Sequence, residues 1–106
     1  YYGAIKACEN QFPSKTSNNN SLLLACTNGV GTQALKEHLG NFELLQTICL
    51  YASTKQQQNT CFEDAMQFQI MATNEDYSKS EKCDTLSEAN SNGQFKAICE
   101  RHAKLP

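Results

Sequence analysis

The chain has 106 residues, of which 40% are hydrophobic and 19% are charged, and its formal net charge at pH 7 is -2. So short a chain cannot fill two independent hydrophobic cores, and we expect one domain over residues 1–106. Charges of both signs are scattered along the chain, which excludes the basic surface of a nucleic-acid-binding protein. The longest apolar run covers residues 22–26 and is much shorter than the about 18 residues needed to span a bilayer, so we expect no membrane span.

Apolar residues recur at intervals of three and four along the chain, which predicts helices and no strand. The first helix ends at Pro13, because proline cannot continue a helix. A short second helix over residues 21–28 ends at Gly29, since Asn-Gly is a common signal at a helix C-terminus. Residues 33–39 are predicted to form a brief connecting helix.

The second half of the chain shows the same periodicity. Asn41 caps a fourth helix, and Thr60 with Glu63 forms a capping box that begins a fifth. A sixth helix covers residues 76–89, and a seventh begins after Gly93. The sequence therefore predicts about six to seven short helices.

Six cysteines, an even number in a short chain, are the strongest indication of the compartment. No two are close enough in sequence to form the Cys-x-x-Cys pair of zinc sites and redox motifs, so we expect three disulfides and no metal or other cofactor. Disulfides persist in oxidising environments, which predicts a secreted protein, exported through a secretory pathway or an oxidising periplasm. A start at Tyr1, without an initiator Met, is what a mature chain has after its signal peptide is removed.

The positions of the cysteines favour one pairing among the 15 that six cysteines allow. Polar connectors over residues 14–20, 53–59 and 90–93 each lie between two cysteine-bearing helices, and the midpoint of each sequential cysteine pair falls inside one of them. Residues equally far from the turn of an antiparallel helix pair lie side by side. We therefore predict an all-α, disulfide-stapled bundle of three helical hairpins, with these pairs: Cys8–Cys26, Cys49–Cys61 and Cys83–Cys99.

Two histidines, His38 and His102, have the chemistry of an acid–base pair for phosphodiester cleavage. A structural explanation is stronger for both. His38 lies at a helix end, where the dipole favours a cation, and His102 follows the inner stripe of the last helix. We expect no catalytic residues and no enzymatic activity.

Two adjacent carboxylate pairs, Glu63 with Asp64 and Glu75 with Asp76, have the chemistry to bind calcium. Both pairs fall in the first turns of predicted helices, where negative charge complements the helix dipole. The alternating acidic loop of a calcium site is missing from the sequence around them. Capping therefore explains these carboxylates without a metal.

The last helix concentrates positive charge within nine residues of an otherwise acidic chain. Arg101 and Lys104 are three residues apart and are predicted to face outward together, a geometry that suits a phosphate or an acidic partner surface. The alternative is that these cations offset the dipole at the helix C-terminus. The candidate anion or partner patch consists of Lys96, Arg101, His102 and Lys104.

Three consecutive leucines, Leu22, Leu23 and Leu24, cannot all be buried on one face of a helix, because neighbours lie 100° apart. At least one must contact a helix outside its own hairpin or remain an exposed apolar contact point. In the connector just before them, Asn19 begins an N-glycosylation sequon, which matters only in a eukaryote.

These features predict a secreted, non-enzymatic binding protein that acts on a protein partner of another cell, as an effector, pheromone or toxin-like factor does. The basis is a small cross-linked scaffold without an assembled catalytic constellation. A lipid-binding protein that takes an apolar ligand or an anionic headgroup is the alternative hypothesis, and a small secreted hydrolase is the third. The partner and the oligomeric state are left open.

Overall fold

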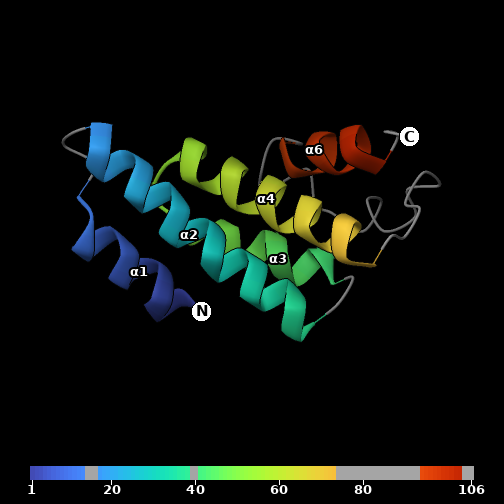
Figure 1. Cartoon of the computed structure of the whole chain (residues 1–106), viewed down its shortest axis with the longest axis horizontal. Coiled ribbons are helices and arrows are strands. Elements are labelled where there is room, and N and C mark those ends of the chain that lie inside the picture. Colours follow the sequence, from blue (N-terminus) through green and yellow to red (C-terminus); the bar gives the residue numbers. More distant parts are fainter. Residues whose placement is uncertain (14–16, 39–40, 74–93, 104–106) are drawn as a thin grey trace.

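The computed structural model describes residues 1–13, 17–38, 41–73 and 94–103, and these residues form five helices and no strand (Figure 1). The helices are α1 (Tyr2–Gln11), α2 (Ser17–Glu37), α3 (Phe42–Cys49), α4 (Lys55–Thr73) and α6 (Gln94–Ala103). The all-α class is confirmed. The prediction of six to seven short helices is not matched, because α2 has 21 residues and α4 has 19. The predicted helix over residues 76–89 lies outside the described residues.

Helix α1 ends at Gln11, two residues before Pro13, as the sequence predicts. Only Ile5 and Cys8 of this helix are buried. Isolated helices shorter than about 12–15 residues are marginal in water, so the helical form of α1 depends on its contacts with the rest of the protein.

Helix α2 replaces the second and third predicted helices, and the prediction that the chain turns at Gly29 is wrong. The Asn28 side chain donates a hydrogen bond to Asp64 of α4 at 2.8 Å, and Gly31 is buried. These tertiary contacts hold the helix through two glycines, although each costs about 1 kcal/mol of helix propensity relative to alanine.

The beginning of α3 is confirmed, while the predicted beginning of α4 is wrong. The Asn41 side chain caps α3, because its Oδ1 accepts a hydrogen bond from the Leu44 N–H at 3.1 Å. Helix α4 begins earlier than Thr60, at a cap formed by Thr54, whose Oγ1 accepts from the Gln57 N–H at 3.2 Å. Thr60 lies inside α4 and donates to the carbonyl of Gln56.

Two of the three predicted disulfides are confirmed, Cys8–Cys26 and Cys49–Cys61. Cys99 is also disulfide-bonded. Its predicted partner, Cys83, lies outside the described residues, so that pairing stays a prediction.

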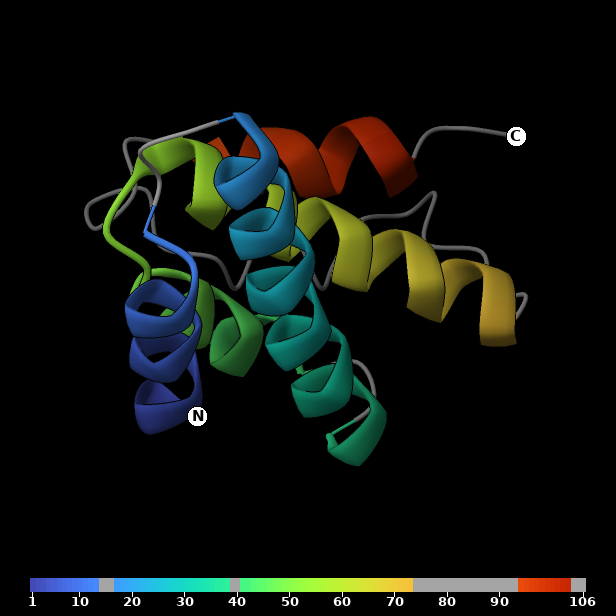
Figure 2. The same ribbon diagram turned by 60° about the vertical axis from the view of Figure 1, so that its left-hand side comes forward.

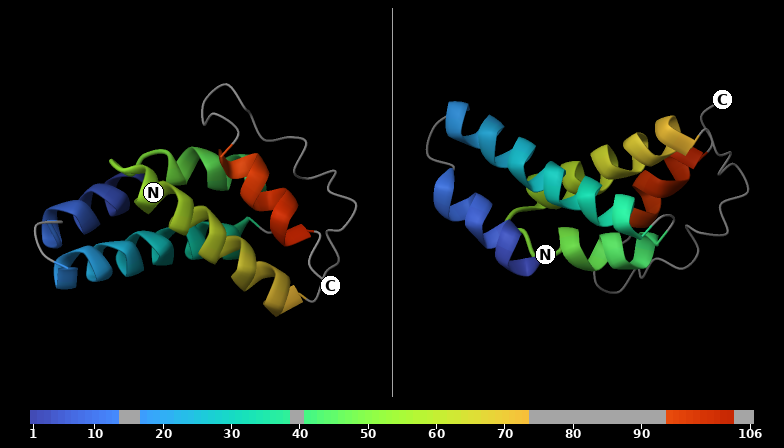
Figure 3. Two further views of the ribbon diagram at one scale, coloured as in Figure 1. Left: turned by 90° about the horizontal axis from the view of Figure 1, so that it is seen from above. Right: turned by 60° about the horizontal axis from the view of Figure 1, so that its bottom comes forward.

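Helices α2 and α4 make the largest helix–helix contact. They run in the same direction, because the contacts Asn20–Gln56 and Asn28–Asp64 advance by equal steps along both, and they cross at an angle (Figure 3). The prediction of three hairpins is therefore not matched: the main contact joins helices that were assigned to different hairpins. Helix α1 packs beside α2, and helix α6 packs beside α4 (Figure 2).

The core is divided into two clusters. The larger joins α2, α3, α4 and α6, and the Phe62 and Phe95 rings stack in it with their centroids 4.9 Å apart. Its buried members are Leu35, Phe42, Leu45, Cys49, Cys61, Phe62, Ala65, Met66, Phe95, Ile98 and Cys99. The smaller cluster, which joins α1 to α2 and α3, consists of Ile5, Ala34, Ile48 and Ala52. Helix α1 contributes only to the smaller cluster.

The crossing of α2 and α4 requires a glycine at position 31. A Cβ atom there would lie 2.8 Å from the Cys61 Sγ and 3.2 Å from the Cys61 carbonyl oxygen. The sulfur belongs to the Cys49–Cys61 disulfide, and both of its cysteines are fully buried. Nothing lies within 4 Å of a Cβ added at Gly29, two residues earlier.

These two glycines make a matched pair of variants. Gly31→Ala should destabilise the protein by about 1–3 kcal/mol, because the added methyl group overpacks the helix crossing. Gly29→Ala should be neutral or stabilise by up to ~1 kcal/mol, because it improves helix propensity without a clash. Thermal unfolding monitored by circular dichroism measures both, and equal melting temperatures for the two variants would contradict the close approach.

Candidate functional site

Two exposed tyrosines from distant parts of the sequence lie side by side. Tyr2 begins α1 and Tyr51 follows α3, and their rings meet edge to face with centroids 5.2 Å apart. Their exposed fractions are 56% and 36%. The Lys6 Nζ lies 5.6 Å from the centroid of the Tyr2 ring, a cation–π arrangement. We call Tyr2, Tyr51 and Lys6 the tyrosine pair site.

Glu9 holds the α1 side of this site against the segment that carries Tyr51. Its Oε1 accepts from the Lys6 Nζ at 3.0 Å, and its Oε2 accepts from the Ser53 N–H at 2.8 Å and from the Gln57 amide at 3.1 Å. The Glu9 side chain is 16% exposed. Partial burial alone would raise its pKa, but the hydrogen bonds from Ser53, Lys6 and Gln57 outweigh burial and lower the pKa from 4.5 to about 2.

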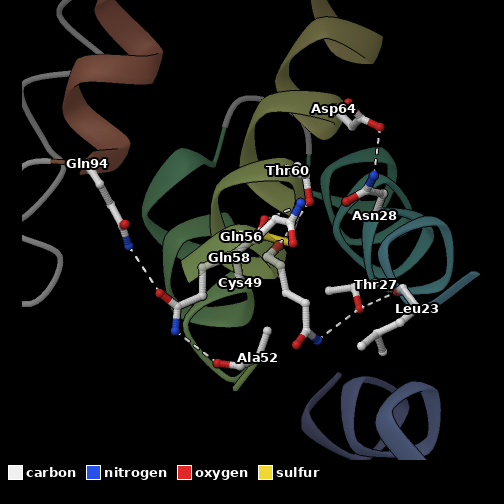
Figure 4. Close-up of a disulfide and its surroundings, with 12 residues drawn as sticks. Leu23, Thr27, Asn28, Cys49, Ala52, Gln56, Gln58, Thr60, Asp64 and Gln94 are labelled. Atoms are coloured by element: carbon white, nitrogen blue, oxygen red, sulfur yellow. Dashed lines mark hydrogen bonds between the residues drawn. A yellow bond between two sulfur atoms is a disulfide. The ribbon is translucent and has the colours of Figure 1, made fainter. Parts of the chain in front are cut away.

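Gln57 connects the same region to α2. It is buried, and its amide nitrogen, which donates to Glu9, also lies 3.5 Å from the Thr27 Oγ1. Its Oε1 accepts from the Thr54 hydroxyl at the cap of α4. Thr27 in turn donates to the carbonyl of Leu23 (Figure 4). Connected polar contacts, some buried and some exposed, therefore join α1 beside the tyrosine pair site to α4 and α2.

Tyr1 extends the exposed aromatic surface at the beginning of α1. It is 42% exposed, and its hydroxyl hydrogen-bonds to Glu37 at the end of α2. Desolvation and this bond to a carboxylate raise the pKa of the Tyr1 hydroxyl. This contact places the residue just before α1 near the last residue of α2.

The predicted basic patch is only partly within the described residues. Arg101 forms an ion pair with Glu63 of α4 at 3.0 Å, and its side chain is 58% exposed. Lys96 is partly buried on the same helix. The side chain of His102 and all of Lys104 lie outside the described residues. The patch therefore stays a prediction, and the charge of Arg101 is partly balanced by Glu63.

The three predicted leucines differ in exposure. Leu23 is buried, Leu24 is partly buried and Leu22 is 49% exposed. Leu22 is thus the most exposed member of the run. Whether it contacts a partner stays a prediction.

The residues weighed for acid–base or metal chemistry have other partners or positions. His38 is exposed where α2 ends, and its backbone N–H donates to the Ala34 carbonyl. Glu63 and Asp64 lie in the middle of α4 and not in its first turn, so the prediction that they cap a helix is wrong. Asp64 accepts a hydrogen bond from Asn28, and Glu63 forms an ion pair with Arg101. Within the described residues, no group of three or more His, Cys, Asp or Glu side chains is placed to hold a metal ion. Glu75 and Asp76 lie outside those residues.

A second exposed apolar area lies towards the C-terminal ends of α2 and α4. Phe68 is 39% exposed, with the Lys36 Nζ 4.8 Å from its ring centroid, and Met71 is 83% exposed. Sequence periodicity does not identify this area or the tyrosine pair site. Tyr2 and Tyr51 are neighbours only through the tertiary fold, and no local pattern marks them.

The comparisons with known proteins give no match. Neither the protein-family models, nor the curated proteins, nor the solved structures contain one for this chain. Among the helices that the structure describes, none has the length and apolar character needed to cross a bilayer. The assignment of function therefore rests on the chemistry of the surface.

Glu9→Gln should destabilise the protein at neutral pH by about 1–3 kcal/mol, because it removes a charged acceptor of three hydrogen bonds. The folded-state pKa lies below the unfolded value, so this stabilisation is present above pH 4.5 and is lost as the pH falls through about 2. The difference in unfolding free energy between wild type and variant should therefore shrink over that interval, measured by urea denaturation. As a control, Glu43→Gln on the exposed first turn of α3 should cost less than about 1 kcal/mol. A pH-independent difference for Glu9→Gln would contradict the role of its charge.

Proposed function

We propose that this protein is a secreted, non-enzymatic binding protein that acts on a protein of another cell, as an effector, pheromone or toxin-like factor does. The observation that carries the proposal is the tyrosine pair site, two exposed aromatic rings held in a defined orientation. Tyrosine is enriched at protein–protein interfaces and in their energetic hot spots. It supplies a large amphipathic contact area with few rotatable bonds, so its ordering costs little entropy.

The scaffold supports this role because it keeps both tyrosines in place before binding. Cys8–Cys26 fixes α1 to α2, and Cys49–Cys61 fixes α3 to α4, closing loops with sequence separations of 18 and 12. In the chain-entropy model each bond contributes about 3 kcal/mol. A surface that is already ordered loses less conformational entropy on association, so more of the contact energy appears as affinity.

The extracellular location in this proposal also has structural support. Two disulfides and the lack of a membrane-crossing helix among the described residues are compatible with an extracellular protein. Export and action on another cell belong to the proposal.

The test is saturable binding of fluorescently labelled protein to intact cells, competed by unlabelled protein. The double variant Tyr2→Ala, Tyr51→Ala should bind at least ~10-fold more weakly, since truncating one hot-spot residue typically costs 2 kcal/mol or more. Met71→Ala, a highly exposed residue at the other end of α4, is the matched control and should bind like wild type. Digestion of the cell surface with protease should abolish binding. Equal binding by the tyrosine variant, with its helix content retained, would exclude this site.

An anionic headgroup bound at α6 is the second candidate, and the exposed guanidinium of Arg101 is the observation that favours it. A guanidinium binds phosphate oxygens through two parallel hydrogen bonds. The ion pair with Glu63 weakens this candidate, because a headgroup would have to compete with a carboxylate already in place. No contact among the described residues favours a hydrolase, so we do not propose one.

Arg101→Ala separates a binding role from a structural one. Exposed ion pairs contribute about 0–1 kcal/mol, so the melting temperature should change little. If α6 binds anionic lipid, sedimentation with phosphatidylserine vesicles should fall in this variant, and wild-type sedimentation should fall as salt rises. Glu63→Gln, which frees the guanidinium, should increase vesicle binding. Vesicle binding that is the same in Arg101→Ala, in Glu63→Gln and at higher salt would exclude Arg101 as a headgroup ligand.

A further inference from the structure

The Cys8–Cys26 disulfide differs from the others in accessibility. Cys26 is partly exposed, whereas the remaining described cysteines, Cys8, Cys49, Cys61 and Cys99, are at most 2% exposed. Thiol–disulfide exchange requires the attacking thiolate to reach a sulfur atom, so access decides which bond is reduced first. Of the two disulfides whose cysteines are both among the described residues, Cys8–Cys26 is therefore the one that includes a partly exposed cysteine, from which side a reductant can approach.

This accessible bond secures the helix that depends least on the main core. Helix α1 contributes no residue to the larger hydrophobic cluster, and it is too short to be stable alone. Apart from the disulfide, its described contacts are the burial of Ile5, the hydrogen bonds of Glu9 and the two tyrosine contacts. Losing the disulfide leaves α1 held by a small number of side chains.

The surface beneath α1 has the features of a binding site for a helix. Ile5 is completely buried in one cluster with Ala34 of α2, Ile48 of α3 and Ala52, and the partly buried Val30 and Leu44 pack against this cluster. Beside this apolar patch, the Ser53 N–H and the Gln57 amide both donate to the Glu9 carboxylate. Ile5 and Glu9 are four residues apart, on the same face of α1. The site therefore binds an apolar side chain and a carboxylate one helical turn later.

We propose that Cys8–Cys26 is a reducible latch and that its cleavage frees α1, so that a foreign amphipathic helix with an apolar side chain and a carboxylate four residues later can take its place. The reductant is a dithiol: it gives up two electrons and two protons and becomes a disulfide, while Cys8 and Cys26 become thiols. Tyr2 belongs to α1 and leaves with it. The tyrosine pair site is therefore present only while α1 is docked, and the site beneath α1 is open only after α1 has left. The inference does not depend on the function proposed above.

Limited reduction of the native protein tests the latch directly. Folded wild-type protein is treated with one equivalent of dithiothreitol, alkylated with iodoacetamide and mapped by mass spectrometry. Cys8 and Cys26 should be labelled at least ~10-fold faster than Cys49 and Cys61 because the second pair is buried, and in denaturant the rates should converge. Equal labelling in the folded state, or earlier labelling of the buried pair, would overturn the proposal.

Release of α1 is tested in the full chain with Cys8→Ser, Cys26→Ser. Amide hydrogen exchange over residues 2–11 should be at least ~10-fold faster than in wild type, while exchange in α4 changes less than ~2-fold. Unchanged protection of α1 would show that the disulfide is no latch. If this variant does not fold, limited reduction of the wild type still decides the question.

The site beneath α1 is probed with a peptide of residues 1–13 that carries Cys8→Ser. Adding Ile5→Glu to the double variant keeps its own α1 away, because a carboxylate would otherwise be buried in the apolar patch. This triple variant should bind the labelled peptide, measured by fluorescence anisotropy, whereas oxidised wild type should not. A peptide that also carries Glu9→Gln should bind at least ~10-fold more weakly. Equal binding of both peptides, binding to the wild type, no binding, or a dimer of the double variant with exchanged α1 helices would each overturn the assignment.

Discussion

The crossing of α2 and α4 at Gly31 and Cys61 is the contact on which the other packing depends. Gly31 brings the α2 backbone so close to Cys61 that a single methyl group would collide with the sulfur. Cys61 also fixes α3 through its disulfide to Cys49, so one point sets the positions of three helices. Further along α4, Phe62 stacks on Phe95 and extends the same core to α6.

Because the main core is centred on α4, α1 is joined to the protein by different forces. Its attachment combines a disulfide, one buried isoleucine and a carboxylate that accepts hydrogen bonds from Ser53 and Gln57. A buried or partly buried carboxylate is stable only when its oxygens are hydrogen-bonded. The hydrogen bonds to Glu9 from Ser53 and Gln57 exist only while α1 is docked, so the charge of Glu9 favours the docked helix. The same contact orients Lys6 towards Tyr2.

Local signals in the sequence were sufficient for part of the fold. Pro13 and Asn41 act through their own backbone geometry and hydrogen bonds, and both helix boundaries follow from them. The two described disulfides were also predictable, because sequential pairing across a turn needs only approximate helix positions. The true start of α4 was readable too, since Thr54 and Gln57 have the same capping-box spacing as Thr60 and Glu63.

What the sequence could not show depends on contacts between distant residues. Gly29 has the appearance of a helix end, and only the bond of Asn28 to Asp64 and the contact of Gly31 with Cys61 make α2 continuous. These interactions join residues that are at least 30 positions apart in the sequence.

The tyrosine pair site has the same origin, because it arises where α1 meets the segment after α3. It therefore shares every constraint that docks α1: the accessible disulfide, the Ile5 contact and the Glu9 carboxylate. An exposed aromatic surface built on the least embedded helix depends on the state of that helix. Any change that frees α1 separates the Tyr2 ring from the Tyr51 ring and at the same time exposes Ile48 and Ala52 to solvent. The arrangement of the exposed tyrosines therefore depends on α1, whereas the closest approach of α2 to α4, between Gly31 and Cys61, does not involve α1.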